Sequence, residues 1–316
     1  MKTVSSELPA GAKCTRCKGR AVVRLPSHNS RFCPDCYIRF VRTAVGRAMK
    51  RFPLPRQASI RVAVSGGKDS LALWDILHDL GYSTRGVHID LGIEGFSGIS
   101  RRAVEDFARE RNLPWSLHFL KDLTGYSIPE ARRLTRRKIC SVCGVFKRRL
   151  LDRLAVGEGG EVLATGHNLD DEAGRLMGNL IRHRTEYLEK FHPFLPSRHP
   201  AMPVKIKPLY RLESVEIRYY CAVKGISPAE EKCPLARGAT SHVYKEALQF
   251  LEDRMPGAKR DFLFSYLKEK GIPWGGGEAL EQCHRCGEPS YGSLCGMCGL
   301  LDQLRANREA VEADGS

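Results

Sequence analysis

The sequence lacks any uninterrupted apolar run that approaches the roughly 20 residues needed to cross a bilayer. Its first residues, Met1 to Ala12, also lack a hydrophobic signal segment. These absences predict a protein without membrane association that works in the cytoplasm. Apolar residues as such are not scarce, because they make up 42% of the 316 residues. That share is typical of a globular protein and excludes a disordered one.

Acidic residues are the second shortage. The chain has 36 Asp and Glu against 51 Lys and Arg, which gives a formal net charge of +15 and predicts a polyanionic partner such as a nucleic acid. Eight basic residues form one basic stretch: Arg132, Arg133, Arg136, Arg137, Lys138, Lys147, Arg148 and Arg149. We predict that this basic stretch contacts nucleic-acid phosphates; an ordinary solvated helix face is the alternative.

Cysteine, in contrast, is abundant, with twelve in the chain, mostly spaced as C-x2-C. In a chain without a secretion signal this spacing indicates metal ligands and not disulfides. Two tetrads have the spacing of tetrahedral zinc sites: Cys14, Cys17, Cys33 and Cys36, and Cys283, Cys286, Cys295 and Cys298. Because such small segments have too little core to fold alone, two Zn²⁺ are predicted to stabilise them.

The tetrads divide the chain into three predicted parts. Residues 1–52 form an N-terminal zinc module with a connecting helix, which ends before a pair of prolines. Residues 53–274 form the central domain. Residues 275–316 form a C-terminal zinc ribbon and tail, joined through Gly275-Gly276-Gly277.

In the central domain, short apolar runs alternate with helix-like segments. The runs are Arg61 to Val64, Thr84 to Asp90, Trp115 to Leu120 and Glu161 to Thr165. Further helices are predicted over Pro129 to Cys140, Gly144 to Ala155, Glu213 to Lys224 and Tyr244 to Met255. This alternation predicts an α/β fold with a doubly wound parallel sheet, which binds ligands at the carboxyl ends of its strands. The stretch from Arg182 to Pro208 is predicted to be an ordered loop over that crevice, with a flexible linker as the alternative.

The segment Ser65-Gly66-Gly67-Lys68-Asp69-Ser70 follows the first apolar run and leads into a helix. Its glycines let a row of N–H groups face an anion at the helix N-terminus, and Lys68 adds a positive charge. The Walker spacing G-x-x-x-x-G-K-S/T is absent. The segment resembles the PP-loop of the N-type ATP pyrophosphatases, which implies ATP binding and adenylation of a substrate oxygen. A glycine-rich turn without a ligand is the alternative.

Four cysteines remain in the central domain. Cys140 and Cys143 share one helix face with Lys147 if that segment is helical. Together with Cys233, which precedes a proline, they would leave one metal position open, as a catalytic metal requires. The alternatives are a zinc site that includes Cys221, and a disulfide or persulfide relay between free thiols. Cys221 lies in an apolar helical pattern and is interpreted as core packing.

Together, these motifs resemble the TtcA/TtuA family of PP-loop tRNA thiolases, and within it the tRNA 2-thiouridine synthetases. The resemblance covers nearly the whole chain. It rests on the PP-loop, the two zinc modules and three further motifs: Cys140-Ser141-Val142-Cys143-Gly144, Gly166-His167-Asn168-Leu169-Asp170-Asp171-Glu172, and Cys233-Pro234 through Gly238-Ala239-Thr240-Ser241. It implies a 4Fe-4S cluster on Cys140, Cys143 and Cys233, together with ATP, Mg²⁺ and a homodimer.

The resemblance also implies the roles of individual residues. The nucleotide would be bound by Ala63, Ser65, Gly66, Gly67, Lys68, Asp69, Ser70, Ile89 and Gly166. Lys147, Asp171 and Asp69 are the catalytic candidates. By charge, Lys147 can neutralise developing phosphate charge, and Asp171 can hold Mg²⁺ or steer a proton. A solvated lysine and a helix-start acid are the ordinary alternatives, and Asp170 is an equally good acid by position.

The predicted function is the conversion of 5-methyluridine in the T-loop of tRNA to 5-methyl-2-thiouridine. ATP would adenylate the 2-oxygen, and sulfur from a ubiquitin-like thiocarboxylated carrier protein would pass through the cluster to C2. Thiolation of the wobble uridine and a PP-loop ligase that modifies tRNA without sulfur are the alternatives within enzymes. A zinc-dependent RNA-binding protein with a vestigial PP-loop is a third hypothesis, which the presence of both Lys68 and Asp69 argues against.

Overall fold

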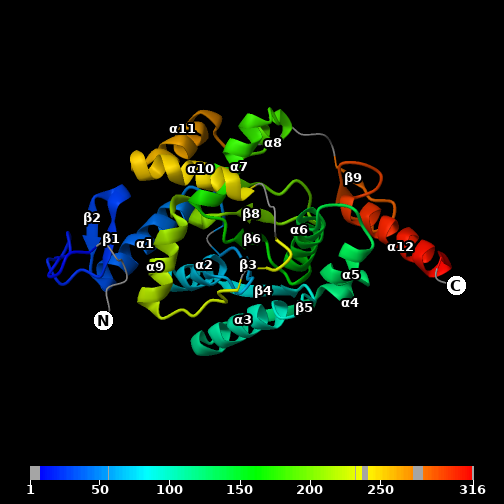
Figure 1. Ribbon diagram of the computed structural model, residues 1–316, viewed down its shortest axis with the longest axis horizontal. Helices are drawn as coiled ribbons and strands as arrows, with labels where there is room; N and C mark the ends of the chain where they lie inside the picture. The colour runs from blue at the N-terminus through cyan, green and yellow to red at the C-terminus, as the bar shows by residue number, and fades with distance from the viewer. Residues whose placement is uncertain (1–7, 56, 232, 237–240, 273–279, 315–316) are drawn as a thin grey trace.

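The computed structural model describes residues 8–55, 57–231, 233–236, 241–272 and 280–314. A central α/β domain carries one cysteine-rich module at each end of its longest axis (Figure 1). The predicted glycine joint at 275–277 and residues 238–240 of the last motif lie outside the described residues. Among the described helices, none combines the length and the apolar character that crossing a lipid bilayer would require.

The central domain is built on a six-stranded sheet with the order β5-β4-β3-β6-β8-β7. The strands are β3 (Ile60–Ala63), β4 (Thr84–Asp90), β5 (Trp115–Phe119), β6 (Val162–Thr165), β7 (Phe194–Leu195) and β8 (Val204–Ile206). All neighbours pair in parallel except β7, which runs antiparallel to β8 at the edge. The predicted doubly wound parallel sheet is therefore confirmed, with one antiparallel edge strand added.

The strand order reverses beside β3. The chain moves outward from β3 through β4 to β5, and then returns to place β6 on the other side of β3. Ile60 lies opposite both Thr84 and Val162, so the three strands are in register. A reversal of this kind opens a crevice at the carboxyl ends of the two central strands. The segments that follow β3 and β6 therefore meet at one place.

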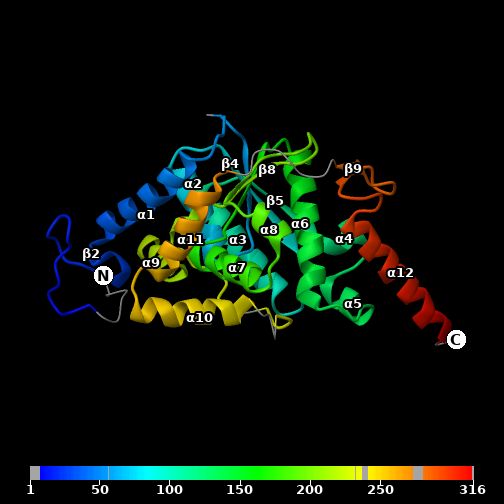
Figure 2. The ribbon, with the colours of Figure 1, turned by 90° about the horizontal axis from the view of Figure 1, so that it is seen from above.

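Helices cover the sheet (Figure 1). They are α2 (Lys68–Asp79), α3 (Ser97–Arg111), α4 (Leu120–Thr124), α5 (Ile128–Arg133), α6 (Ile139–Gly157), α7 (Leu169–Ile181), α8 (Thr185–Glu189), the 3-10 helix η2 (Pro208–Arg211), α9 (Ser214–Lys224), α10 (Ser241–Arg254) and α11 (Ala258–Lys270). Helix α2 packs against β3 and β4, and α6 packs against β4 and β6. Helices α10 and α11 both lie along α7 (Figure 2).

Two predictions about the central domain are wrong in detail. The stretch from Arg182 to Pro208 is not a loop over the crevice, because it forms α8 and the two outermost strands. Phe194 and Ile206 from these strands are buried in the core, which accounts for their place in the sheet. The predicted helix over Pro129 to Cys140 ends at Arg133, and the next helix begins at Ile139.

The two terminal modules pack into the central domain in different ways. The N-terminal module contains β1 (Val23–Leu25), the 3-10 helix η1 (Pro26–His28), β2 (Ser30–Phe32) and α1 (Pro34–Met49), and its apolar residues join the main core. The C-terminal module contains β9 (Glu281–Gln282), β10 (Pro289–Ser290) and α12 (Gly296–Asp314). Its Leu300 and Leu304 form a second core with Phe146 and Leu150 of α6. The C-terminal module therefore supports the helix that carries Cys140 and Cys143.

Candidate active site

The PP-loop connects β3 to α2, and its conformation requires glycine at position 66. Gly66 has a φ of +80°, and a Cβ added there would lie 2.4 Å from the carbonyl oxygen of Ser100. The hydroxyl of Ser70 accepts a hydrogen bond from the N–H of Ser65 at 3.1 Å and donates one to the carbonyl of Gly67 at 2.9 Å. Within the described part of the chain, no side chain caps the N-terminus of α2. Its first N–H groups can therefore bind an anion.

Asn168 links the PP-loop to the start of α7. Its side-chain amide donates to Oδ1 of Asp69 at 3.1 Å, and its side-chain oxygen accepts from the N–H of Asp171 at 3.1 Å. The carboxylate of Asp171 accepts from the N–H of Asn168 in return, which completes a capping box. Lys68 pairs with Asp69 at 2.7 Å. The structure thus brings two of the catalytic candidates, Asp69 and Asp171, to the same asparagine.

The sequence left Asp170 and Asp171 equivalent, but the structure separates them. Asp170 accepts from the N–H of Ser214 at 2.6 Å and pairs with the buried Lys259 at 2.5 Å. Asp171 pairs instead with Lys245 of α10. Asp170 therefore fastens α7 to the core, whereas Asp171 lies on the side of the PP-loop.

Glu172, the third acid of this turn, is fully buried and pairs with Lys207. The nitrogen of Lys207 lies 2.8 Å and 2.9 Å from the two carboxylate oxygens. Burial lowers the pKa of Lys207 to about 8, against the opposing effect of the Glu172 charge. This pair and Lys245 were missed from the sequence, because the lysines lie far along the chain from their acids. Asn168 had a local signal, since asparagine before a run of acids is a common N-cap.

The other predicted nucleotide residues lie at the same edge of the sheet. Ala63 ends β3, Ile89 is the penultimate residue of β4, and Gly166 directly follows β6. A Cβ added at Gly166 would lie 2.9 Å from the backbone nitrogen of Ser70. Glycine at this position is therefore needed for the close approach of the chain to α2, whether or not it also touches a nucleotide.

Cys140, Cys143 and Lys147 all lie on α6. The segment is therefore helical, which is what the prediction that the three residues share one helix face required. Cys140 is exposed, while Cys143 and Cys233 are partly buried. Burial raises the pKa of the Cys143 thiol; the Lys147 charge opposes this effect, and the charges of Cys233 and Cys140 add to it. Cys143 and Cys233 also pack against the same apolar core. Lys147 is placed to favour the thiolate form of Cys143.

One short segment joins this cysteine site to the PP-loop. After α9, the N–H of Ala229 donates to the carbonyl of Gly66 at 2.9 Å. Four residues further on is Cys233, and the carbonyl of Leu235 lies 3.9 Å from the thiol of Cys140. Four extended residues span at most about 14 Å, so Cys233 lies within that distance of Ala229 and hence close to the PP-loop. The anion site and the cysteine site are thus neighbours.

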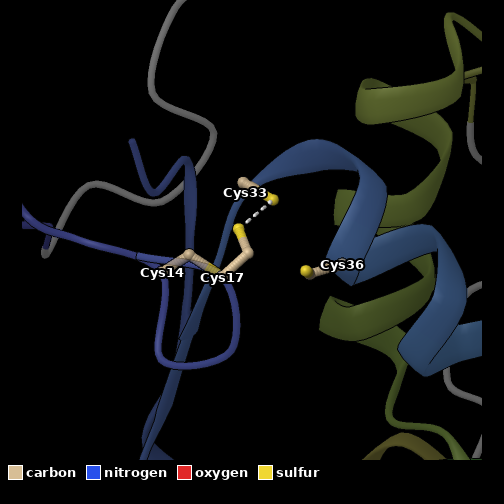
Figure 3. A group of neighbouring side chains, drawn as sticks. All are labelled: Cys14, Cys17, Cys33 and Cys36. Carbon is tan, nitrogen blue, oxygen red and sulfur yellow. Dashed lines mark hydrogen bonds between the residues drawn. The ribbon is translucent and has the colours of Figure 1, made fainter. Parts of the chain in front are cut away.

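Each terminal tetrad brings its four thiols within 4.8 Å of one another. In the N-terminal tetrad the thiols converge from the loop after Ala12 and from the start of α1, with the sulfurs of Cys17 and Cys33 3.4 Å apart (Figure 3). In the C-terminal tetrad, the N–H of Cys295 donates to the sulfur of Cys283 at 3.3 Å and lowers its pKa to about 5. Four converging thiolates are the donor set of structural zinc.

The three cysteines of the central domain do not form such a group in the part of the chain that the structure describes. Three thiolates are a donor set that can hold a 4Fe-4S cluster. Cys221 is not among them. It is buried and its thiol lies 3.6 Å from the carbonyl of Lys68, so its interpretation as core packing is confirmed.

A PP-loop at the switch point of a parallel sheet defines the class of PP-loop ATP-binding proteins. Residues 41–233 match the family model of the PP-loop domain, and residues 13–38 match that of the N-terminal LIM domain of 2-thiouridine synthetase TtuA. The chain belongs to the tRNA-5-methyluridine(54) 2-sulfurtransferase family of PP-loop proteins. The member from Thermus thermophilus is 43% identical, over 92% of this chain and 91% of its own.

More distant comparisons agree. The tRNA-5-methyluridine(54) 2-sulfurtransferase of Pyrococcus horikoshii is 36% identical, over 90% of this chain and 92% of its own. The structure of the U34-tRNA thiolase NcsA from Methanococcus maripaludis with its 4Fe-4S cluster has a TM-score of 0.79 at 25% identity. The match covers 92% of this chain and 96% of that one. Nearly the whole chain therefore has the fold of a tRNA thiolase.

Proposed function

We propose that this protein is an ATP-dependent tRNA 2-sulfurtransferase that converts 5-methyluridine 54 to 5-methyl-2-thiouridine. The observation that carries the proposal is a pair of contacts six residues apart in the chain: Ala229 is bonded to Gly66 of the PP-loop, and the carbonyl of Leu235 lies beside the thiol of Cys140. Such an arrangement serves a reaction with two requirements. An oxygen must be made a leaving group by ATP, and sulfur must be delivered to the same carbon.

The residues of the PP-loop would act on the first requirement. The N–H groups at the start of α2 and the ammonium of Lys68 would hold the phosphates of ATP. Asp69 and Asp171, both bonded to Asn168, are the carboxylates that would hold Mg²⁺. Lys147 would neutralise charge that develops on the phosphate as the uridine 2-oxygen attacks. Pyrophosphate then leaves, and the adenylated oxygen can later leave as part of AMP.

Cys140, Cys143 and Cys233 would hold a 4Fe-4S cluster. When bound by three thiolates, such a cluster supplies one iron with an open position that can carry sulfur. Lys147 stands one helical turn from Cys143, and its charge opposes the rise in the pKa of the Cys143 thiol that burial causes. The exposure of Cys140 leaves the site open to a sulfur donor, for which we propose a ubiquitin-like carrier with a C-terminal thiocarboxylate.

The position of the modified base is inferred from the relatives. The three that are 36% to 43% identical are named as acting on 5-methyluridine 54. The NcsA structure, named as a U34-tRNA thiolase, is 25% identical. The higher identity over nearly the full length favours position 54 over the wobble position.

The tRNA would contact the basic stretch next to the cysteines. Six of its side chains are exposed besides Lys147: Arg132, Arg133, Arg136, Arg137, Lys138 and Arg148. Arg149 has a different role, because it pairs with Glu288 of the C-terminal module at 3.0 Å. Binding through phosphates predicts a strong dependence on salt. We further propose that the protein works in the cytoplasm as a homodimer.

The test is nucleoside mass spectrometry of tRNA incubated with ATP, a sulfide source and either cluster-loaded or cluster-free protein under anaerobic conditions. Only the loaded protein is expected to yield 5-methyl-2-thiouridine, with pyrophosphate released in step. Equal thiolation by cluster-free protein would contradict the metal role. A ligase that uses no sulfur would release pyrophosphate and leave a product without the added sulfur mass, and an RNA-binding protein with a vestigial loop would release none.

A further inference from the structure

The first turn of α7 carries three consecutive acids, each paired with a lysine from another element. In the pairs made by Asp170 and Glu172, no side chain is more than 13% exposed. In the third pair, Lys245 is 34% exposed and Asp171 is 25% exposed. Breaking a buried ion pair leaves an uncompensated charge, whereas an open pair exchanges partners at little cost. Among these three lysines, Lys245 alone has an ammonium that can readily move to another anion.

The sequence of α7 brings Lys245 to this place. A Cβ added at Gly174 would lie 3.1 Å from Cγ of Lys245, and one added at Gly178 would lie 2.9 Å from Cε2 of Tyr244. Two glycines one turn apart therefore let α10 approach α7 closely along this face (Figure 2). This close approach places Lys245 over the first turn of α7.

The neighbours of the pair belong to the PP-loop. Asp171 is bonded to Asn168, and Asn168 is bonded to Asp69, which holds Lys68. Lys68 and Lys245 therefore lie at the two ends of one chain of hydrogen-bonded residues, in which Asn168 and Asp171 are linked through their backbone N–H groups. Both ammonium groups pair with carboxylates. A polyphosphate at the start of α2 would offer each of them a stronger anionic partner.

We propose that Lys245 is a ligand of the nucleotide phosphates, and that its pairing with Asp171 is its resting arrangement. This inference rests on the proposed function, because it deepens the ATP site. When ATP occupies the PP-loop, the ammonium of Lys245 moves to a phosphate oxygen and leaves the carboxylate of Asp171 free. Lys245 thus both adds positive charge to the site and controls when Asp171 can act.

The test compares the binding of ATP and of adenosine by calorimetry, without tRNA or sulfur donor. Lys245→Met is expected to weaken ATP binding by roughly 10-fold or more, the loss of one charged hydrogen bond, and to leave adenosine binding unchanged. Lys245→Arg is expected to retain most of the ATP affinity. The matched control is Lys121→Met, which removes another exposed lysine paired with one carboxylate, Glu130 of α5. This control is expected to bind ATP as the wild type does.

A second variant tests the geometry without removing a charge. Gly178→Ala forces α10 away from α7 at Tyr244 and is expected to weaken ATP binding in the same direction as Lys245→Met. Equal weakening of ATP and adenosine by Lys245→Met, or no weakening of either, would overturn the role of Lys245. If the wild type thiolates tRNA in that case, the proposed function stands. A wild type that binds no ATP would overturn both.

Discussion

In the proposed function, the terminal tetrads and the central cysteine site use the same side chain for opposite purposes. Each tetrad gathers four thiols within 4.8 Å, and two cysteines of the N-terminal tetrad and three of the C-terminal one are buried. The central site has three thiols, one exposed and two partly buried, on a long helix and an irregular segment. A closed set of four satisfies the metal completely and can only stabilise, whereas a set of three leaves a position for chemistry. The difference lies in ligand number and access, not in residue type.

The two kinds of site also differ in what holds them in place. Each tetrad fixes its own small module, whose strands are only two or three residues long. The central site depends on its surroundings. Helix α6 rests on a core shared with the C-terminal module, and Arg149 of α6 pairs with Glu288 of that module. The closed C-terminal site therefore supports the open one.

The largest effect is expected from removing a ligand of the open site. Cys143→Ser should abolish thiolation, by more than the roughly 10- to 100-fold that the loss of a second-shell partner costs at a metal site. The unfolding temperature should change little, because this site is not a closed structural metal site and the core does not depend on it. Nucleoside mass spectrometry, iron content and thermal unfolding measure these effects. Cys221→Ala is the matched control and should keep its iron and its activity; a loss of iron in that variant would refute the assignment of ligands.

Removing a ligand of the closed C-terminal site should give the reverse balance. Cys283→Ser is expected to lose one zinc ion per chain and lower the unfolding temperature by roughly 10 °C, as several kcal/mol would in a domain of this size. Activity should fall only in proportion to the fraction of the protein that is unfolded or in which α6 has lost its support. Zinc analysis and calorimetry test this balance. If Cys283→Ser abolished thiolation while the fold and the iron were intact, the C-terminal tetrad would have a direct role.

The sequence predicted the closed sites because their information is local. Cys14 and Cys17 lie within one short loop, and the same spacing recurs at Cys283 and Cys286, so spacing alone specifies the metal geometry. The PP-loop was equally visible, since Gly66 must adopt a positive φ next to a strand. The structure of a motif of a few residues can be predicted from its sequence when the loop itself and its ligand supply most of the contacts.

The parts that the sequence did not reveal depend on distant contacts. Strands β7 and β8 have two and three residues, too few to show an alternating pattern, and they form because an existing sheet offers them an edge. Lys245 lies 74 residues from Asp171, with no pattern that links the two. The separate roles of Asp170 and Asp171 likewise come from Lys259 and Lys245, which only the folded chain brings to them.

The shared core predicts an intermediate effect that separates support from chemistry. Phe146→Ala removes a fully buried ring between α6 and α12 and should lower the free energy of unfolding by about 3–5 kcal/mol. Zinc should remain bound, because no ligand is changed, while iron should be retained less well as α6 becomes mobile. Denaturant unfolding and metal analysis of the same sample test this. Loss of zinc with retention of iron would show that the support runs in the opposite direction.

The smallest effect concerns α5, which leads into the open site without help from a metal. Glu130 completes a capping box with Ser127, and Lys121 and the N–H of Ser127 lower its pKa to about 2. A carboxyl whose pKa is lowered on folding stabilises the protein above about pH 4.5, and this contribution disappears as the pH falls toward 2. Because the side chain is 36% exposed, we expect only about 1 kcal/mol.

Glu130→Gln and Glu130→Ala separate the two parts of this contribution. The glutamine keeps the capping hydrogen bond and removes the charge, so it should lose less stability than the alanine. As the pH is lowered from 7 to 3, the unfolding free energy of Glu130→Gln should approach the wild-type value, whereas Glu130→Ala should keep the part of the difference that comes from the lost capping bond. A difference from the wild type that stays constant over this range would show that the charge of Glu130 contributes nothing. Helix α5 would then be held by the capping bond of Ser127 and by packing in the core that it shares with α6 and the C-terminal module.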